Sequence, residues 1–157
     1  MADYIKSFRD GVLSVVDGTA TPIVTVCLVA EGDLKIKETS NVVGVLDRGT
    51  LHEIKVGDEA PIEVSFGIKM TGYQVGSVTA LEAIKKTGAA AAFVSTRAAT
   101  TQVYTVDLKF EVKGVNGSTE ETITVSDFYW ESCEMSEGDP NMFSVSGKAW
   151  STAVVVT

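Results

Sequence analysis

The most regular stretch of the chain alternates apolar and polar residues from Pro61 to Met70. Apolar residues occupy the even positions from Ile62 onward, and polar residues or glycine occupy the odd positions between them. Because successive side chains of a strand point to opposite faces, this run predicts a strand with one apolar and one water-facing stripe. Pro61 stands first, where its missing N–H costs least. We therefore take 61–70 as the central strand of the fold.

Other runs alternate in the same way and predict further strands. Those before the central strand are 4–7, 11–16, 23–30 and 34–38, and those after it are 102–113, 120–130 and 143–156. Glu31-Gly32-Asp33 has the composition of a tight turn, so we expect 23–30 and 34–38 to pair as a hairpin. The apolar phase shifts after Val125, which predicts a β-bulge near Ser126-Asp127.

One segment has the period of a helix. Thr79-Ala80-Leu81-Glu82 matches a capping box, in which the first and last side chains satisfy each other's backbone N–H groups. The apolar residues expected on its buried face are Val78, Leu81 and Ile84. Gly88 is suited to the left-handed residue that ends a helix. The sequence therefore predicts a short amphipathic helix at about 80–87.

Residues 39–49 lose the alternation, and we interpret 39–58 as a long loop. Loops of this length in compact domains are usually functional or interfacial. Its apolar side chains are too numerous to lie in water without a partner. The residues expected at an interface are Val42, Val43, Val45, Leu46 and Arg48.

Length and composition indicate one globular domain spanning 1–157. A chain of 157 residues that is 45% hydrophobic and 22% charged has enough apolar material for one core, which argues against disorder. The pattern of strands with a single helix predicts a mainly β fold: an antiparallel β-sandwich or partly closed barrel with one short flanking α-helix.

Charge and hydropathy exclude two kinds of partner. The net charge is −8 and no basic patch is present, which argues against tight binding of nucleic acid. The longest apolar run, 23–30, is too short to cross a bilayer, so we expect no membrane partner. Residues 1–10 lack the pattern of a secretory signal, and we expect the protein to be made or assembled in a cytoplasm.

No motif indicates an active site. Cys27 and Cys133 belong to no metal-ligand spacing, and we expect buried free thiols. His52 is the only histidine, which favours a surface or interfacial role over a metal ligand or catalytic base. The acidic group within 131–139 does not match an EF-hand. The aromatic residues expected to anchor the core or an interface are Trp130 and Trp150. We expect no catalytic residue, no metal and no cofactor.

An ordered set of features resembles the tail tube proteins of long-tailed bacteriophages. The set comprises Gly32-Asp33-Leu34, Arg48-Gly49 through Gly57-Asp58, the 61–70 strand, the 79–87 helix, and the run from Asp139-Pro140 to Gly147. The resemblance implies a non-enzymatic virion protein that forms hexameric rings with copies of itself, stacked into a tube through which DNA passes. It also implies assembly in the host cytoplasm and other tail proteins as partners, such as tape measure, sheath or terminator. Related folds serve contractile tails, tailocins and type VI secretion tubes. The 88–101 segment matches nothing in that pattern.

A tube requires one polar strand face to line its channel. The candidates are Glu63, Ser65 and Lys69 on one strand, and Thr105, Asp107, Lys109 and Glu111 on another. A basic lining would retain DNA through its phosphates, whereas an acidic or mixed one would let it slide. We therefore expect a net negative lining in which each lysine has a carboxylate beside it.

The sequence also admits a second class of function. A non-enzymatic β-sandwich that binds a ligand or decorates a virion would show the same strands and the same lack of an active site. What favours the tube is the exposed edge strands of a sandwich, which isolated proteins must protect and which a closed ring pairs with the next subunit.

Overall fold

The structure is a computed structural model that describes residues 11–19, 21, 24–27, 34–69, 78–97, 103–114, 119–139, 141–151 and 153–157. The strand predicted at 4–7 lies outside these residues. The elements are β1 (Val12–Val16), β2 (Val24–Cys27), β3 (Lys35–Lys37), β4 (Val42–Asp47), β5 (Thr50–Val56), β6 (Ile62–Lys69), α1 (Ala80–Lys85), the short 3-10 helix η2 (Gly88–Ala90), β7 (Val106–Lys113), β8 (Thr119–Ser136), β9 (Met142–Ala149) and β10 (Val155–Val156).

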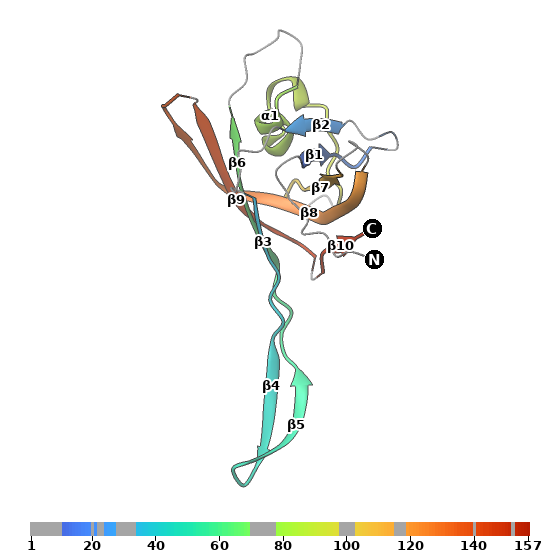
Figure 1. The fold of residues 1–157 in the computed structure, drawn as a ribbon, viewed down its shortest axis with the longest axis vertical. Coiled ribbons are helices and arrows are strands. Elements are labelled where there is room, and N and C mark those ends of the chain that lie inside the picture. The colour runs from blue at the N-terminus through green and yellow to red at the C-terminus, as the bar shows by residue number, and fades with distance from the viewer. Residues whose placement is uncertain are drawn as a thin grey trace.

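The strands form one curled sheet and one small separate sheet. The curled sheet has the order β2-β1-β7-β8-β9-β6-β3, with β10 paired to β8, and it closes part of the way round like half a barrel. The small sheet contains β4 and β5 (Figure 1). Every pairing in the described part of the chain is antiparallel. The predicted fold class, mainly β with one short helix, is confirmed.

The core lies on the face of the sheet that β6 was predicted to bury. Its even residues from Ile62 to Ile68 are buried, and the register places Val106, Phe128, Ala149 and Ile62 in one row across β7, β8, β9 and β6. Each large side chain buried here contributes about 1.5–3 kcal/mol. The row therefore ties the four longest strands of the sheet to one another.

Helix α1 packs against the β1 and β2 end of the sheet (Figure 1). Its capping box is present, and the hydrogen bond from the Thr79 N–H lowers the pKa of Glu82. The helix ends earlier than predicted, because Lys86 already takes the left-handed conformation at the C-cap, with φ 55°. Gly88, two residues further on, is left-handed as well, with φ 56°. Its buried residues are Ala80, Ala83 and Ile84, whereas Leu81 is half-buried.

The predicted bulge is present in β8. The register between β7 and β8 shifts between Val106 and Leu108, whose partners are Phe128 and Val125, so two β8 residues stand opposite one. Asp127 has φ 57°, and its N–H donates to Asp107 Oδ1 at 3.0 Å. An aspartate of β7 thus satisfies the backbone group that the bulge removes from the ladder.

One predicted pairing and one predicted strand length are wrong. The 23–30 and 34–38 strands do not form a hairpin: β2 pairs with β1, and β3 pairs with β6. The last strand is not continuous from 143 to 156. It breaks after Ala149, because the Trp150 N–H donates to Asp127 O at the bulge, and the chain resumes as β10 on β8. Both errors came from local pattern, which does not choose strand partners.

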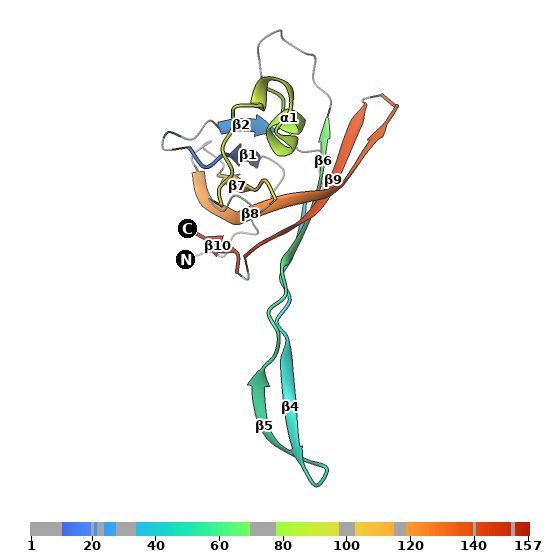
Figure 2. The ribbon, with the colours of Figure 1, turned by 180° about the vertical axis from the view of Figure 1, so that it is seen from behind.

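The 39–58 segment is not a loop. It contains β4 and β5, which form a hairpin that extends well beyond the curled sheet in both views (Figures 1 and 2). Its two-residue turn is Arg48-Gly49, with φ 48° and 84°, and positive φ at both positions is the requirement of a type I′ turn. Hereafter this hairpin, residues 42–56, is the arm.

The burial of α1 gives a prediction for stability. Replacing Ile84 with Asp places an unpaired charge at a position that is 2% exposed, so the free energy of unfolding should fall by about 3–5 kcal/mol. Urea denaturation measures the loss. Lys86→Ala is the matched control, because that side chain is exposed and its change should cost less than about 1 kcal/mol. Equal losses in the two variants would contradict the assigned faces.

Candidate functional site

The arm has one apolar face. Its register pairs Val42 with Val56, Gly44 with Ile54 and Leu46 with Leu51, and a shift in register leaves His52 unpaired. Since alternate residues of a strand share a face, these pairs lie on one side of the hairpin. A Cβ placed on Gly44 would lie 3.1 Å from Leu51 Cδ1, which agrees with this assignment. We call Val42, Leu46, Leu51, Ile54 and Val56 the apolar arm face.

This face is exposed in the single chain. Its five side chains are 58–89% exposed, the extremes being Leu51 and Val56. An isolated two-stranded hairpin is at best marginally stable in water. A contiguous exposed apolar patch of this kind marks an interaction surface. The arm is therefore the strongest candidate site for contact with another molecule.

All five predicted interface residues lie on the arm, but on different sides of it. Val42 and Leu46 belong to the apolar face, Val43 and Val45 to the opposite face, and Arg48 to the turn. The three apolar residues of β5 were not predicted from the sequence. The signal was present, because Arg48-Gly49 between two apolar runs is a hairpin turn.

A second surface lies on the curled sheet, opposite the core. The register of β3, β6, β9 and β8 aligns Lys37, Glu63, Lys148 and Tyr129 in one row, and Lys35, Ser65, Ser146 and Ser132 in the next. Shallow hollows lie along these rows. We define the polar face by its charged and hydroxyl residues, which are Lys35, Lys37, Glu63, Ser65, Lys69, Glu131, Ser132, Glu134, Ser144, Ser146 and Lys148.

The polar face carries mixed charge. Two of its four lysines lie beside a carboxylate: Lys37 Nζ is 3.6 Å from Glu63, and Lys148 Nζ is 3.7 Å from Glu131. With three glutamates against four lysines, the formal charges nearly cancel. The sequence led us to expect a channel lining with net negative charge. If this face lined a channel, its charge would be nearly neutral instead.

The second set of residues predicted to line the channel lies on β7, and it is not continuous with the polar face. β7 pairs with the first half of β8, whereas β9 pairs with its second half. Lys109 is exposed, and the pKa of Glu111 is lowered by the hydrogen bond from Lys113 at 2.7 Å. Asp107 is half-buried beneath its hydrogen bond to the bulge.

The prediction that Thr105 faces the lumen is wrong, because its side chain is 0% exposed. The 95–97 segment covers it: Thr96 Oγ1 lies 2.7 Å from Thr105 Oγ1, and the Arg97 N–H donates to that oxygen at 3.2 Å. Thr96 Oγ1 also donates to Asp127 Oδ1 at 2.7 Å. Part of the Ala-rich segment thus holds the start of β7 against the bulge of β8.

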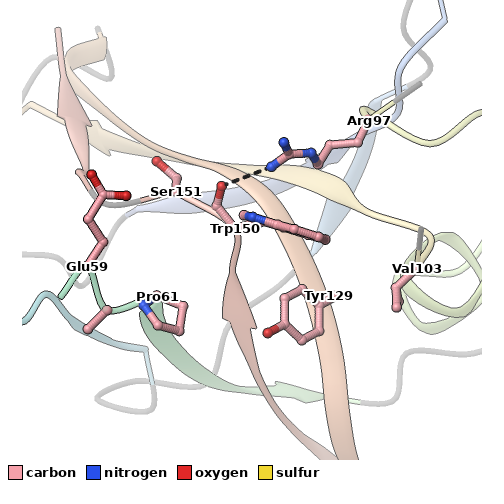
Figure 3. Close-up of a pocket in the computed structure, with 8 residues that line it drawn as sticks. Glu59, Pro61, Arg97, Val103, Tyr129, Trp150 and Ser151 are labelled. Carbon is pink, nitrogen blue, oxygen red and sulfur yellow. Dashed lines mark hydrogen bonds between the residues drawn. The ribbon is translucent and has the colours of Figure 1, made fainter. Parts of the chain in front are cut away.

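A pocket of about 700 Å³ lies where the arm joins the sheet. Its lining residues are Glu59, Ala60, Pro61, Arg97, Val103, Tyr129, Trp150 and Ser151 (Figure 3). The Arg97 guanidinium lies 4.3 Å from the centre of the Trp150 ring and donates to Trp150 O at 3.4 Å. Figure 3 shows the indole between Arg97 and the Tyr129 ring. We call this the Trp150 pocket.

Neither tryptophan is in the core. Trp150 is 48% exposed at the pocket, and Trp130 is 38% exposed beneath the ammonium of Lys85, which lies 4.8 Å from its ring centre. Their predicted role as core anchors is therefore wrong, and a role as interface anchors stays a prediction. A cation lies over each ring, and such a contact contributes about 0.5–1 kcal/mol at an exposed site.

The described residues contain no cluster of three or more metal-ligating side chains. His52 lies exposed on the arm, and Cys133 is a half-buried free thiol, whereas the Cys27 side chain lies outside the described residues. In the part of the chain that the structure describes, no helix is both long and apolar enough to span a membrane.

Comparisons with known proteins identify the fold. No protein-family model matches the sequence, and no curated protein matches it significantly. Among solved structures, a chain of the PVC sheath–tube complex of an extracellular contractile injection system matches with a TM-score of 0.64 at 12% identity, covering 99% of this chain and 93% of that one. A chain of the PVC sheath/tube terminator matches with a TM-score of 0.64 at 13% identity, covering 100% and 99%.

A third match is a chain of the tube-terminating cap of the anti-feeding prophage, with a TM-score of 0.61 at 9% identity, covering 100% of this chain and 93% of that one. Identities this low show a shared fold and no more. The chain has the fold of these contractile-system proteins along its whole length.

Asp107 gives a prediction that depends on pH. Its pKa is raised from 3.8, chiefly because burial disfavours the carboxylate. The hydrogen bond from the Asp127 N–H opposes this rise in pKa, the charge of Asp127 adds to it, and Lys109 opposes it. Below pH 3.8 the side chain is protonated in both the folded and the unfolded state. As the pH rises through the raised folded-state pKa, ionisation costs the folded state stability.

Asp107→Asn keeps the oxygen that accepts from the Asp127 N–H and removes the charge. This variant should be more stable than the wild type at pH 7, and the difference should vanish near pH 3. Urea denaturation at the two pH values measures it. A variant less stable than the wild type at pH 7 would show that the carboxylate is favoured in the fold.

Proposed function

We propose that this chain is a self-assembling structural subunit of a phage-tail-like tube, built from hexameric rings stacked end to end. The observation that carries the proposal is the apolar arm face, which has no cover within the described chain. The whole-length likeness to chains of a sheath–tube complex and of a tube terminator supports the same function.

Energetics favour a second copy as the cover. Burying the five side chains of the apolar arm face would contribute on the order of 10 kcal/mol. Association costs about 4–15 kcal/mol in lost freedom, so one arm contact can offset much of that cost. Each subunit offers one arm, and a contact between two different surfaces repeats from copy to copy. Such a contact builds a ring or an open stack rather than a closed dimer, and we propose the stack.

Ring closure requires a lateral contact, and the edge of the curled sheet supplies one. β3 is short and pairs with β6 through Glu63–Ser65. On that side, β6 has no further strand partner over Phe66–Lys69 within the described residues. An unpaired edge is a template for a strand of the neighbouring subunit.

The polar face is the proposed channel lining. Its four lysines lie among three glutamates, and two of the lysines pair with a carboxylate, so few positive charges are free to hold phosphates. Its serines keep it wettable without fixed charge. DNA would pass along it without specific binding. We propose sheath, terminator and tape-measure proteins as the other partners, a location in the tail of the particle, assembly in the host cytoplasm, and no enzymatic activity.

Removing the arm tests the proposal. Asn41 and Gly57 close its base, with the Gly57 N–H donating to Asn41 O at 2.9 Å. Replacing Val42–Val56 with Asn-Gly preserves that hydrogen bond as the closing bond of a type I′ turn, so the domain should stay folded. The wild type should form rings or tubes in negative-stain micrographs at high concentration, and the variant should sediment as a monomer.

Two outcomes would overturn the proposal. Tubes formed by the armless variant would show that the arm is not the contact. A wild type that stays monomeric at high concentration would favour the ligand-binding or decoration domain. A matching thermal melt of the two proteins confirms that the variant has kept its fold.

A further inference from the structure

The tip of the arm carries one acidic and one basic side chain, Asp47 and Arg48. Asp47 and Arg48 are exposed, and neither makes an ion pair with another described residue. Arg48 occupies a turn position with φ 48°, where Asn, Asp or Gly is preferred. An arginine in this conformation points to a role for its side chain outside the chain. Leu46 and Leu51 lie directly behind the turn.

The Trp150 pocket is complementary to this tip. Trp150 and Tyr129 supply an aromatic surface, with Arg97 on one side and Glu59 on the other (Figure 3). Arg97 is fixed by the indole and by Asp127, whose Oδ2 lies 3.8 Å from Nη1. Glu59 is exposed and forms no ion pair with the residues described. The pocket thus offers one carboxylate and one guanidinium beside an apolar wall.

We propose that the Trp150 pocket receives the arm tip of a second copy. Leu46 and Leu51 cover the aromatic wall, Arg48 pairs with Glu59 of the second copy, and Asp47 turns toward its Arg97. The inference rests on the proposed function, because the occupant is another subunit, and it names the surface on which the arm ends.

A copy cannot fill its own pocket. Gly49 and Pro61 are twelve residues apart, and the chain between them runs away from the sheet (Figures 1 and 2). At about 3.3 Å per residue, these twelve residues span at most about 40 Å, so the tip lies well away from the pocket. A tip seated in the next copy therefore displaces successive copies along the arm by up to about 40 Å. Because the two surfaces differ, the contact can repeat from copy to copy and does not end at a dimer.

Charge reversal tests the pairing of Arg48 with Glu59. Arg48→Glu alone and Glu59→Arg alone should each raise the concentration needed for assembly about tenfold or more, because each places like charges together. The double variant should restore assembly. Both positions are exposed, so neither change should disturb the fold. The matched control is Arg48→Glu with Glu137→Arg, which adds the same charge at another exposed glutamate and should restore nothing.

Disulfide crosslinking tests directly whether the arm tip of one copy lies in the Trp150 pocket of another. Asp47→Cys mixed with Ser151→Cys should yield a covalent dimer under oxidation, and the two substitutions in one chain should yield a ladder of oligomers. Asp47→Cys mixed with Ser144→Cys is the control, because Ser144 lies on the polar face away from the pocket. The wild type, with Cys27 and Cys133, gives the background.

The outcomes of these experiments distinguish a failure of the pocket assignment from a failure of the tube proposal. Wild-type tubes with no rescue and no crosslink above background would overturn the pocket assignment and leave the tube proposal intact. A wild type that does not assemble would overturn both. Binding of an oligosaccharide by the monomer, lost in Trp150→Ala and retained without the arm, would assign the pocket to a ligand instead.

Discussion

An apolar stripe on a two-stranded arm is the constraint on which the rest of this structure depends. A hairpin that exposes Leu46, Leu51, Ile54 and Val56 has no core of its own, and a single chain offers it none among the described residues. The curled sheet, in contrast, has a core of its own. Its cross-strand row of core residues makes a rigid platform, and β6 continues from that platform directly into the arm. The domain is thus a stable base for an extension that needs another molecule.

Most of the fold follows from local pattern. The alternation of 61–70 predicted β6 and its buried face, the capping box predicted α1, and the phase shift after Val125 predicted the bulge at Asp127. Strand partners did not follow, because alternation fixes which face of a strand is buried and not which strand lies beside it. The break after Ala149 depends on a hydrogen bond to a residue 23 positions earlier, which no local window contains.

The candidate site was predicted only in part, for a physical reason. Sequence reasoning found that 39–58 is an interface candidate from its apolar content. It missed the strands because β4 carries valine on both faces, which removes the period that marks a half-buried strand. It placed Thr105 on a wet face because threonine continues the alternation, but the 95–97 segment covers it. The Trp150 pocket joins residues from distant parts of the chain and could not be predicted from sequence.

Hydrogen exchange across assembly tests most directly whether the arm is covered by another copy. Amides of 42–56 should exchange rapidly in dilute monomer, because a lone hairpin opens readily. In the assembled form they should become strongly protected, whereas the amides of β7 should change little because that strand is already packed in the core. Arm amides that exchange equally fast in both states would show that the arm stays in water and that subunits meet through another surface.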